Sequence, residues 1–310
     1  MTLKLNEIRM RDPFILEAGN LYYLYGTTDE NLWGGPATGF DYYTSKDLES
    51  WDGPFQAFRP SAGFWSDTQY WAPEVHEYSG SFFMFATFAT SDPKHKVRGT
   101  AVLKAVSPAG PFQPWSDGPV TPVNLPCLDG TFFVDEAEQP WIVYSRGAEG
   151  SLTAKGIDDG EMYAAKLSLD LKEVDGEPQL LFTSKSASWS RPLWFPPGVE
   201  PPAELGLAKD PHFTDGPFLF RTPNGSLKMI WSAFGNAGYA IGVATSLSGE
   251  VIGPWKQEET PLWAENGGHG MILRRSNGTD YLIFHAPNET PNERVQLVQL
   301  RITDNGVNII

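Results

Sequence analysis

A pair of short apolar strands joined by a tight turn recurs five times along this chain. The first strands of the five pairs begin at residues 12, 74, 129, 215 and 269, so successive starts lie 62, 55, 86 and 54 residues apart. Turn-forming residues separate the two strands, as in Ala18-Gly-Asn20 and Pro223-Asn-Gly225, which is typical of β-hairpins. Helical periodicity is almost absent, so the repeat predicts an all-β fold.

A third strand is predicted after each pair, at 40–45, 100–105, 162–167, 239–245 and 295–301. Units of about four strands at periods of this length are typical of β-propeller blades. We therefore expect residues 1–310 to form one domain, a five-bladed β-propeller. A β-sandwich also has many short strands and is the alternative, but five similar units with matching starts favour the propeller.

The longest interval between repeats contains an insertion at residues 184–213. Loops of this length inside a compact domain are often functional rims or lids. The insertion is therefore expected to form one wall of a binding cleft, with a surface excursion that has no role as the alternative.

Composition and charge exclude several classes of partner. The net charge of −15 argues against nucleic acid and anionic membranes, and it favours a neutral substrate over a polyanionic one. The single cysteine, Cys127, cannot form an internal disulfide. The first fifteen residues lack the apolar core of a signal peptide and no segment could span a bilayer, so a cytoplasmic protein is expected. No feature of the sequence indicates an oligomeric state.

The first strand of every propeller blade lines the central channel, so the repeat starts should meet near one mouth of it. The residues at these starts are Asp12, Glu74, Asp129, Asp215 and His269. Unpaired carboxylates in a confined space repel one another and are costly to desolvate, which indicates a functional site. Clustered carboxylates serve either metal binding or glycoside hydrolysis; a sequence-local calcium loop is absent, which favours the hydrolase.

Five motifs of this sequence together resemble glycoside hydrolase family 43, whose members are five-bladed β-propeller glycosidases. The motifs are Arg11-Asp-Pro-Phe-Ile15, Trp71-Ala-Pro-Glu-Val75, Leu128-Asp-Gly-Thr131, Asp215-Gly-Pro217 and Gly268-His-Gly270. The resemblance covers essentially the whole chain and implies an inverting mechanism. Asp12 would be the general base, Asp129 would orient the acid and raise its pKa, and the acid would stand at the start of the fourth blade.

At the acid position this chain departs from the family pattern. The family usually has Glu-Gly-Pro, whereas this chain has Asp215-Gly-Pro217, which places the carboxyl about one methylene closer to its backbone. We prefer the interpretation in which the scaffold keeps Asp215 competent. The alternatives are that Glu74 is the acid, or that the protein binds sugar without cleaving it.

The resemblance also suggests residues that would bind the substrate. His269 matches the family's axial histidine, which holds water or an ion, so a central calcium or sodium ion is compatible with the site. No organic cofactor is expected. Arg294 matches an arginine that the last blade offers to the acids and substrate, although a solvent-exposed arginine is the alternative.

Aromatic residues near the motifs are candidates for stacking on a sugar ring, although aromatic residues in propellers mostly pack between blades. The candidates are Phe14, Trp33, Trp71 and Trp231, of which Trp33 is expected at the cleft rim. Nothing in the sequence pairs the remaining histidines or the cysteine into a nucleophile or zinc site, and these residues stay unassigned: His76, His95, His212, His285 and Cys127.

By family precedent the substrate would be a neutral plant-derived oligosaccharide from which a terminal α-L-arabinofuranosyl or β-D-xylosyl unit is released. Galactosides and other furanosides are less favoured, and a phosphate-dependent phosphorylase is disfavoured by the acidic site. Inversion predicts carboxyl groups about 6.5–9.5 Å apart, whereas a separation of about 5 Å would indicate a retaining route. Exo and endo action both remain open.

Overall fold

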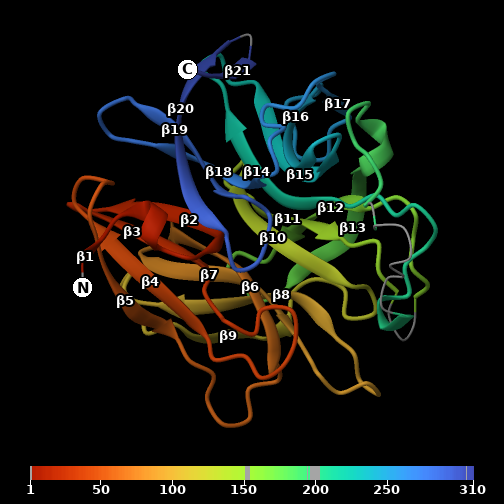
Figure 1. Cartoon of the computed structure of the whole chain (residues 1–310), viewed down its shortest axis with the longest axis horizontal. Helices are drawn as coiled ribbons and strands as arrows, with labels where there is room; N and C mark the ends of the chain where they lie inside the picture. The colour runs from red at the N-terminus through yellow and green to blue at the C-terminus, as the bar shows by residue number, and fades with distance from the viewer. Residues whose placement is uncertain (1, 151–153, 194, 196–202, 305) are drawn as a thin grey trace.

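Five antiparallel sheets surround a common centre in the computed structural model of this chain (Figure 1). The structure describes residues 2–150, 154–193, 195, 203–304 and 306–310. In each sheet the four main strands follow one another in sequence order from the innermost to the outermost, and β1 (Thr2–Leu3) is added at the outer edge of the first sheet. The predicted five-bladed β-propeller is confirmed, and the β-sandwich is excluded.

The first two blades are built from the first 119 residues. Blade 1 contains β2 (Arg11–Ala18), β3 (Leu21–Thr27), β4 (Phe40–Ser45) and β5 (Trp51–Phe58), with β1 (Thr2–Leu3) paired to the outer edge of β5. Blade 2 contains β6 (Thr68–Tyr78), β7 (Ser81–Ala89), β8 (Arg98–Ala105) and β9 (Gln113–Pro119).

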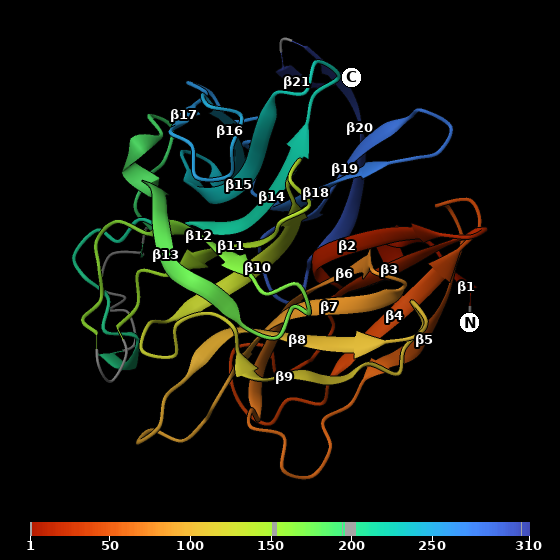
Figure 2. The same ribbon diagram turned by 180° about the vertical axis from the view of Figure 1, so that it is seen from behind.

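The remaining three blades follow in the same order around the ring, as the view from the opposite face also shows (Figure 2). Blade 3 contains β10 (Cys127–Val134), β11 (Pro140–Arg146), β12 (Glu161–Leu167) and β13 (Val174–Thr183). Blade 4 contains β14 (Asp215–Arg221), β15 (Leu227–Gly235), β16 (Gly238–Ser246) and β17 (Trp255–Gln257). Blade 5 contains β18 (Gly268–Arg274), β19 (Asp280–Ala286), β20 (Arg294–Thr303) and β21 (Gly306–Ile309). Short 3-10 helices are η1 (Leu5–Glu7), η2 (Ser184–Ser186) and η3 (Ala203–Leu205).

The hydrophobic core lies between adjacent blades, because side chains of a strand alternate between its two faces and each face meets a neighbouring blade. Among the largest fully buried side chains are Trp51, Tyr25, Phe88 and Trp231. Burying an aromatic or large aliphatic side chain stabilises the fold by roughly 1.5–3 kcal/mol. The aromatic strand runs read from the sequence are therefore this inter-blade core.

Blade 5 meets blade 1 to close the ring, and each of these two blades is built from strands of its own segment of the chain. Arg9 forms an isolated bridge with Arg294. The hydroxyl of Ser276 donates to Glu17 Oε1 at 2.7 Å, which joins the two inner hairpins. Closure therefore depends on side-chain and short backbone contacts between the first and last thirds of the chain.

The insertion is divided between core and surface. Trp189 is buried, and the centroid of its ring lies 5.1 Å from that of Trp231. The start of the insertion therefore fills space between strands of blades 3 and 4. Leu205 lines a hollow on the surface. Residues 194 and 196–202 lie outside the described residues. Within the described part of the chain no helix is long and apolar enough to cross a membrane.

Candidate active site

Each inner strand begins with a bulge that places one residue in the left-handed backbone region. The pairing register shifts there in all five blades, for example between Arg11 and Phe14 and between Gly268 and Met271. The left-handed residues, with φ between 46° and 54°, are Asp12, Ala72, Asp129, Gly216 and His269. The bulge turns these five residues toward the centre of the ring, where the inner strands converge.

The positions of the bulges show that the five residues predicted at the strand starts are not all equivalent, which corrects the prediction from the sequence. Ala72 and Gly216, not Glu74 and Asp215, occupy the positions equivalent to Asp12. Asp215 precedes its bulge residue by one position, and Glu74 follows its bulge residue by two. The third position of all five motifs is Pro or Gly, and alignment on that position would have revealed the register from the sequence.

In blades 1, 2 and 4, a small polar side chain near the end of the second strand accepts the backbone N–H of the bulge residue in the next blade. Thr27 Oγ1 accepts from Ala72 N at 2.9 Å, and Thr87 Oγ1 accepts from Asp129 N at 2.8 Å. Ser232 Oγ accepts from His269 N at 2.8 Å. These cross-blade bonds pair the N–H groups that the bulges remove from the sheet ladder.

The pattern changes between blades 3 and 4. There Ser145 pairs with Thr214 rather than with the bulge residue. The N–H of Gly216 donates instead to Asp129 Oδ2 at 3.2 Å. A Cβ at Gly216 would lie 2.8 Å from Cγ of His269, so only glycine fits here. The backbone of blade 4 thus holds the carboxylate of blade 3.

Asp12, Asp129 and Asp215 all line one small cavity at the centre. The cavity has a volume of about 90 Å³. Its other lining residues are Arg11, Leu32, Trp33, Trp71 and Leu128. The structure therefore brings together the three acids that the sequence placed in one pocket.

Asp12 is surrounded by groups that favour its ionised form. Burial alone would raise the pKa of Asp12, but the charges of His269 and Arg11 outweigh it and hold the pKa below its usual value. Thr27 Oγ1 donates to Asp12 Oδ2 at 2.6 Å and strengthens this effect. Asp12 is therefore a carboxylate at neutral pH.

The other two acids have raised pKa values, Asp215 more than Asp129. Burial raises the pKa of Asp215 to about 8, and the negative charges of Asp129 and Glu149 add to the effect. Burial also raises the pKa of Asp129 to about 6, although the charge of His269 opposes it. The hydroxyl of Tyr239 donates to Asp215 Oδ2 at 3.1 Å. One cavity thus holds an ionised carboxylate and a protonated carboxyl, as acid–base catalysis requires.

His269 lies between two of the acids. Its Nδ1 is 3.3 Å from Asp12 Oδ1 and 3.5 Å from Asp129 Oδ2. Burial would lower the pKa of His269, but these two carboxylates outweigh it and raise the pKa above its usual value. His269 Nδ1 is therefore placed to bridge the two carboxylates.

Sequence reasoning missed His285, which orients Asp12 from blade 5. The N–H of Asp12 donates to His285 Nδ1 at 3.1 Å, and His285 Nε2 lies 3.3 Å from Asn288 Oδ1. Burial lowers the pKa of His285 to about 3, so the ring is neutral and carries its proton on Nε2. The sequence does contain a signal for this position, because a polar residue follows the apolar run in the second strand of each blade. These residues are Thr27, Thr87, Ser145, Ser232 and His285.

Glu74 does not reach the cavity that the three aspartates share. Its Oε2 accepts from Thr131 Oγ1 at 2.7 Å and lies 3.0 Å from His76 Nε2. Glu74 is buried and is not among the residues that line the cavity. This position gives no support to Glu74 as the acid.

Two of the four candidate aromatic residues lie at the cavity and two do not. Trp33 is 60% exposed at the rim and meets Trp71 edge-on, with ring centroids 5.9 Å apart. Trp231 is fully buried against Trp189, and Phe14 is buried against His76, so neither presents a face to a sugar. Because Trp231 is adjacent to Ser232 on β15, it points to the opposite side of the strand, into the inter-blade core.

The arginine at the cavity is Arg11 rather than the predicted Arg294. The guanidinium of Arg294 donates to the backbone oxygens of Asn6 and Pro291, away from the acids. Its neighbour Glu293 points inward and pairs with Arg11 at 3.1 Å. Adjacent residues of an extended chain point in opposite directions, which explains the exchange.

Comparison with known proteins identifies the family of this chain. The family model described as glycosyl hydrolases family 43 matches residues 5–307. The chain belongs to glycosyl hydrolase family 43.

Individual proteins similar to this chain match almost its whole length. An endo-arabinase from Bacteroides thetaiotaomicron VPI-5482 has a TM-score of 0.83 and 36% identity, and the match covers 97% of this chain and 98% of that one. The extracellular exo-α-(1→5)-L-arabinofuranosidase ArbA of Cellvibrio japonicus (strain Ueda107) is 25% identical over 97% of this chain and 85% of its own length. An endo-1,4-β-xylanase from Bacteroides thetaiotaomicron VPI-5482, 24% identical with a TM-score of 0.73 over 100% of this chain and 97% of that one, shares the fold.

The expectation of a cytoplasmic location is contradicted by this comparison. ArbA, which this chain matches over 97% of its length, is an extracellular enzyme.

The family-43 resemblance also raised the question of a central ion. Among the residues that the structure describes, no group of three or more His, Cys, Asp or Glu side chains is placed to hold a metal. Calcium prefers six to eight oxygen ligands, so an ion here would depend on water and backbone oxygens.

Proposed function

We propose that this protein is an inverting glycosidase that releases α-L-arabinofuranosyl units from neutral plant-derived oligosaccharides. The observation that carries the proposal is the separation of pKa values in one cavity, where Asp12 is ionised and the pKa of Asp215 is raised to about 8. The names of the endo-arabinase and of ArbA favour an arabinose-containing substrate over a xyloside.

In the proposed mechanism Asp12 removes a proton from water as the water attacks the anomeric carbon. Asp215 delivers its proton to the oxygen of the leaving group on the other side of the sugar ring. Burial, and after it the negative charges of Asp129 and Glu149, keep Asp215 protonated before the reaction. His269 holds the two carboxylates of Asp12 and Asp129, while Trp33 and Trp71 flank the sugar.

A panel of 4-nitrophenyl glycosides tests this proposal. We expect turnover of the α-L-arabinofuranoside, with the β-D-xyloside, galactoside and other furanosides slower, and an inverted anomer as the first product seen by proton NMR. Asp12→Asn should reduce kcat by about 10²–10⁴-fold on every substrate, because water activation is lost. Sugar binding without turnover on the whole panel would overturn the proposal in favour of a lectin-like propeller, and a retained anomer would overturn inversion.

The leaving group separates the acid from the base. Asp215→Asn should reduce kcat/KM far more on arabinobiose than on the 4-nitrophenyl glycoside, since nitrophenolate departs with little protonation. Equal losses on both substrates would contradict Asp215 as the acid.

We also propose that the reaction needs neither an organic cofactor nor an exchangeable metal ion, because the two carboxyl groups carry both proton transfers. Dialysis against EDTA should leave kcat within about twofold of its starting value. Loss of activity that added calcium restores would contradict this.

Finally, we propose that the protein acts outside the cell, as ArbA does. Immunoblots of culture medium, membrane and cytoplasmic fractions of the source organism would test the location. Protein confined to the cytoplasmic fraction would contradict the proposal.

A further inference from the structure

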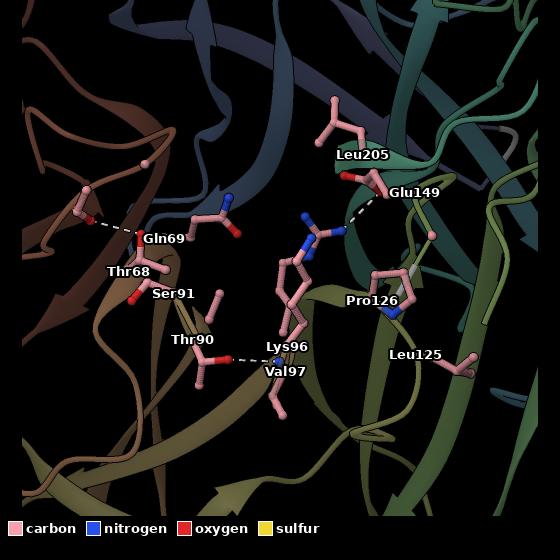
Figure 3. A pocket seen from close by; sticks show the side chains of 15 residues that line it. Thr68, Gln69, Thr90, Ser91, Lys96, Val97, Leu125, Pro126, Glu149 and Leu205 are labelled. Carbon is pink, nitrogen blue, oxygen red and sulfur yellow. Dashed lines mark hydrogen bonds and ion pairs between the residues drawn. The ribbon is translucent and has the colours of Figure 1, made fainter. Parts of the chain in front are cut away.

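The loop that carries Trp33 lies between the catalytic cavity and a hollow on its other side. This rim loop, residues 28–39, connects β3 to β4. Trp33 lines the catalytic cavity, whereas the two glycines that follow it line a hollow of about 280 Å³ between blades 2 and 3. Figure 3 shows that hollow with Thr68 and Gln69 of β6 at one side. Thr68 Oγ1 donates to Gly35 O at 2.9 Å and Gln69 Nε2 to Trp33 O at 3.4 Å, so blade 2 fixes the backbone of the rim loop.

The indole of Trp33 is held from the opposite side, by blade 5. Its Nε1 donates to Thr290 Oγ1 at 3.3 Å, and the hydroxyl of Thr290 donates in turn to Glu293 Oε1. Arg11 Nη1 donates to the same oxygen of Glu293 at 3.1 Å. The guanidinium carbon of Arg11 lies 5.0 Å from the centroid of the Trp33 ring. These four residues therefore form a closed circuit where blade 5 meets blade 1, which we call the rim circuit.

Glu293 is the buried centre of the rim circuit. Its side chain is 0% exposed, and its Oε2 lies 3.7 Å from Arg9 Nε. Arg9 Nη1 donates to the backbone oxygen of Asp29 in the rim loop at 2.8 Å. A buried carboxylate paired with guanidinium groups contributes little net stability, because desolvation offsets the attraction. Stability of the fold therefore does not account for an acid at this position, whereas the groups that it holds at the site do.

Glu293 keeps Arg11 apart from the catalytic acids. Arg11 lines the cavity together with the three aspartates. A guanidinium beside carboxylates forms strong, charge-assisted hydrogen bonds with them unless another partner holds it. Within the described part of the chain, however, the ion pair of Arg11 is with Glu293. A guanidinium has several N–H groups, so those that Glu293 does not take are left for the hydroxyls of a sugar.

We propose that Glu293 is a positioning residue for substrate binding, which acts through Arg11 and Thr290 on the sugar in the cavity. This inference rests on the proposed function, because the ligand is the neutral sugar of an arabino-oligosaccharide. Arg11 supplies N–H donors to its hydroxyls and Trp33 supplies an aromatic face, while Glu293 itself does not touch it. Breaking the rim circuit therefore weakens substrate binding more than the chemical step.

Substitutions at Thr290 test the circuit with little effect on folding, since this side chain is exposed. Thr290→Val keeps the branched shape but removes the hydroxyl that joins Trp33 to Glu293, whereas Thr290→Ser retains a hydroxyl. We expect Thr290→Val to raise KM for α-1,5-arabinotriose by about three- to tenfold with kcat within about twofold. Thr290→Ser should remain within about twofold of the wild type in both constants. An unchanged KM in Thr290→Val, or an equal rise in Thr290→Ser, would overturn the proposal.

A second pair of variants tests the charge of Glu293. Glu17→Gln is the matched control, because Glu17 joins the same two blades through Ser276 at the opposite end of β2, away from the cavity. We expect Glu293→Gln to raise KM for arabinotriose by at least about tenfold and Glu17→Gln to leave it within about twofold. Glu293→Gln still offers an oxygen to Thr290, so in an Arg11→Ala background it should raise KM by less than about twofold more. Equal effects of the two glutamine variants, or full additivity with Arg11→Ala, would overturn the proposal.

Calorimetric titration separates this inference from the proposed function. Arabinotriose should bind about three- to tenfold more weakly to Asp12→Asn combined with Thr290→Val than to Asp12→Asn alone. The same loss of affinity in a protein whose wild type shows no turnover would mean that the proposed function fails while the positioning role stands. Equal affinities would overturn the positioning role, whether or not the wild type is active.

Discussion

At the scale of single residues, the candidate site depends on strained backbone that neighbouring blades hold in place. Asp12, Asp129 and His269 all have φ between 51° and 54°, a region that costs a non-glycine residue roughly 1–2 kcal/mol. Each N–H of these residues is held by a side chain of the preceding blade, which closes the ring through His285. Left-handed residues of this kind concentrate at functional sites because they aim side chains that regular strands cannot.

Removal of the ring nitrogen that holds Asp12 should impair catalysis more than binding. In His285→Leu the buried N–H of Asp12 loses its acceptor, so the carboxylate shifts, and we expect kcat to fall by about 10–100-fold with KM within about threefold. His285→Gln, which retains an acceptor, should recover part of the loss. Steady-state kinetics below the melting temperature measure both variants. An unchanged kcat in folded His285→Leu would show that His285 is only structural.

The pH dependence of kcat/KM should report the acid. Asp215 must be protonated to act, so activity should fall as the pH rises through about 8. Glu149→Gln removes a negative charge that raises the pKa of Asp215, so the alkaline limb should move to lower pH. Profiles of kcat/KM on arabinobiose, whose leaving group needs the proton of Asp215, measure the alkaline limb in both proteins. An alkaline limb that stays in place or moves upward in Glu149→Gln would exclude this electrostatic link.

At the scale of elements, the insertion serves two purposes. Its first part buries Trp189 against Trp231, where a Cβ on Gly242 would lie only 2.1 Å from the indole of Trp189. Its later part supplies Leu205 to the hollow. Glycine on β16 therefore makes room for the insertion, and the insertion in turn completes a wall beside the site.

Substitutions at two tryptophans should have separate effects, one on the stability of the fold and the other on substrate binding. Trp189→Ala leaves a large cavity in the core, and we expect it to lower the free energy of unfolding by about 3–5 kcal/mol with KM within about twofold at low temperature. Trp33→Ala, at the exposed rim, should leave the melting temperature nearly unchanged and raise KM for arabino-oligosaccharides. Thermal melts and initial rates on both variants check the contrast. The reverse pattern would contradict the assignment of core and rim.

At the scale of the whole molecule, the candidate site belongs to no single blade. Blade 1 supplies Asp12, blade 3 Asp129, blade 4 Asp215 and blade 5 His269, so the constellation exists only when the ring is closed. The molecule carries a net charge of −15, and its central cavity is itself lined by carboxyl groups. Long-range and local charge therefore act in the same direction on an approaching polymer.

Polysaccharide charge should decide binding accordingly. In affinity gels run at low salt, neutral linear arabinan should retard the Asp12→Asn variant, whereas de-esterified polygalacturonate should not, because its carboxylates are repelled. The inactive variant prevents digestion of the gel. Stronger retardation by polygalacturonate would contradict a neutral substrate.

The sequence by itself determined the five repeats, their hairpins and the three aspartates that meet at the centre. These features follow from local patterns, since turn residues and apolar runs set strand positions without reference to distant contacts. The side on which each residue falls was decided by the tertiary structure. A strand has a period of two, so a shift of one residue moves a side chain to the opposite face, and the bulge sets that phase. For this reason Glu74, Trp231 and Arg294 lie away from the cavity, while Arg11 lines it and His285 accepts the N–H of Asp12. The pairing of Arg98 with Glu149 joins β8 to the β11–β12 connection, and only the packing of blade 2 on blade 3 brings them together.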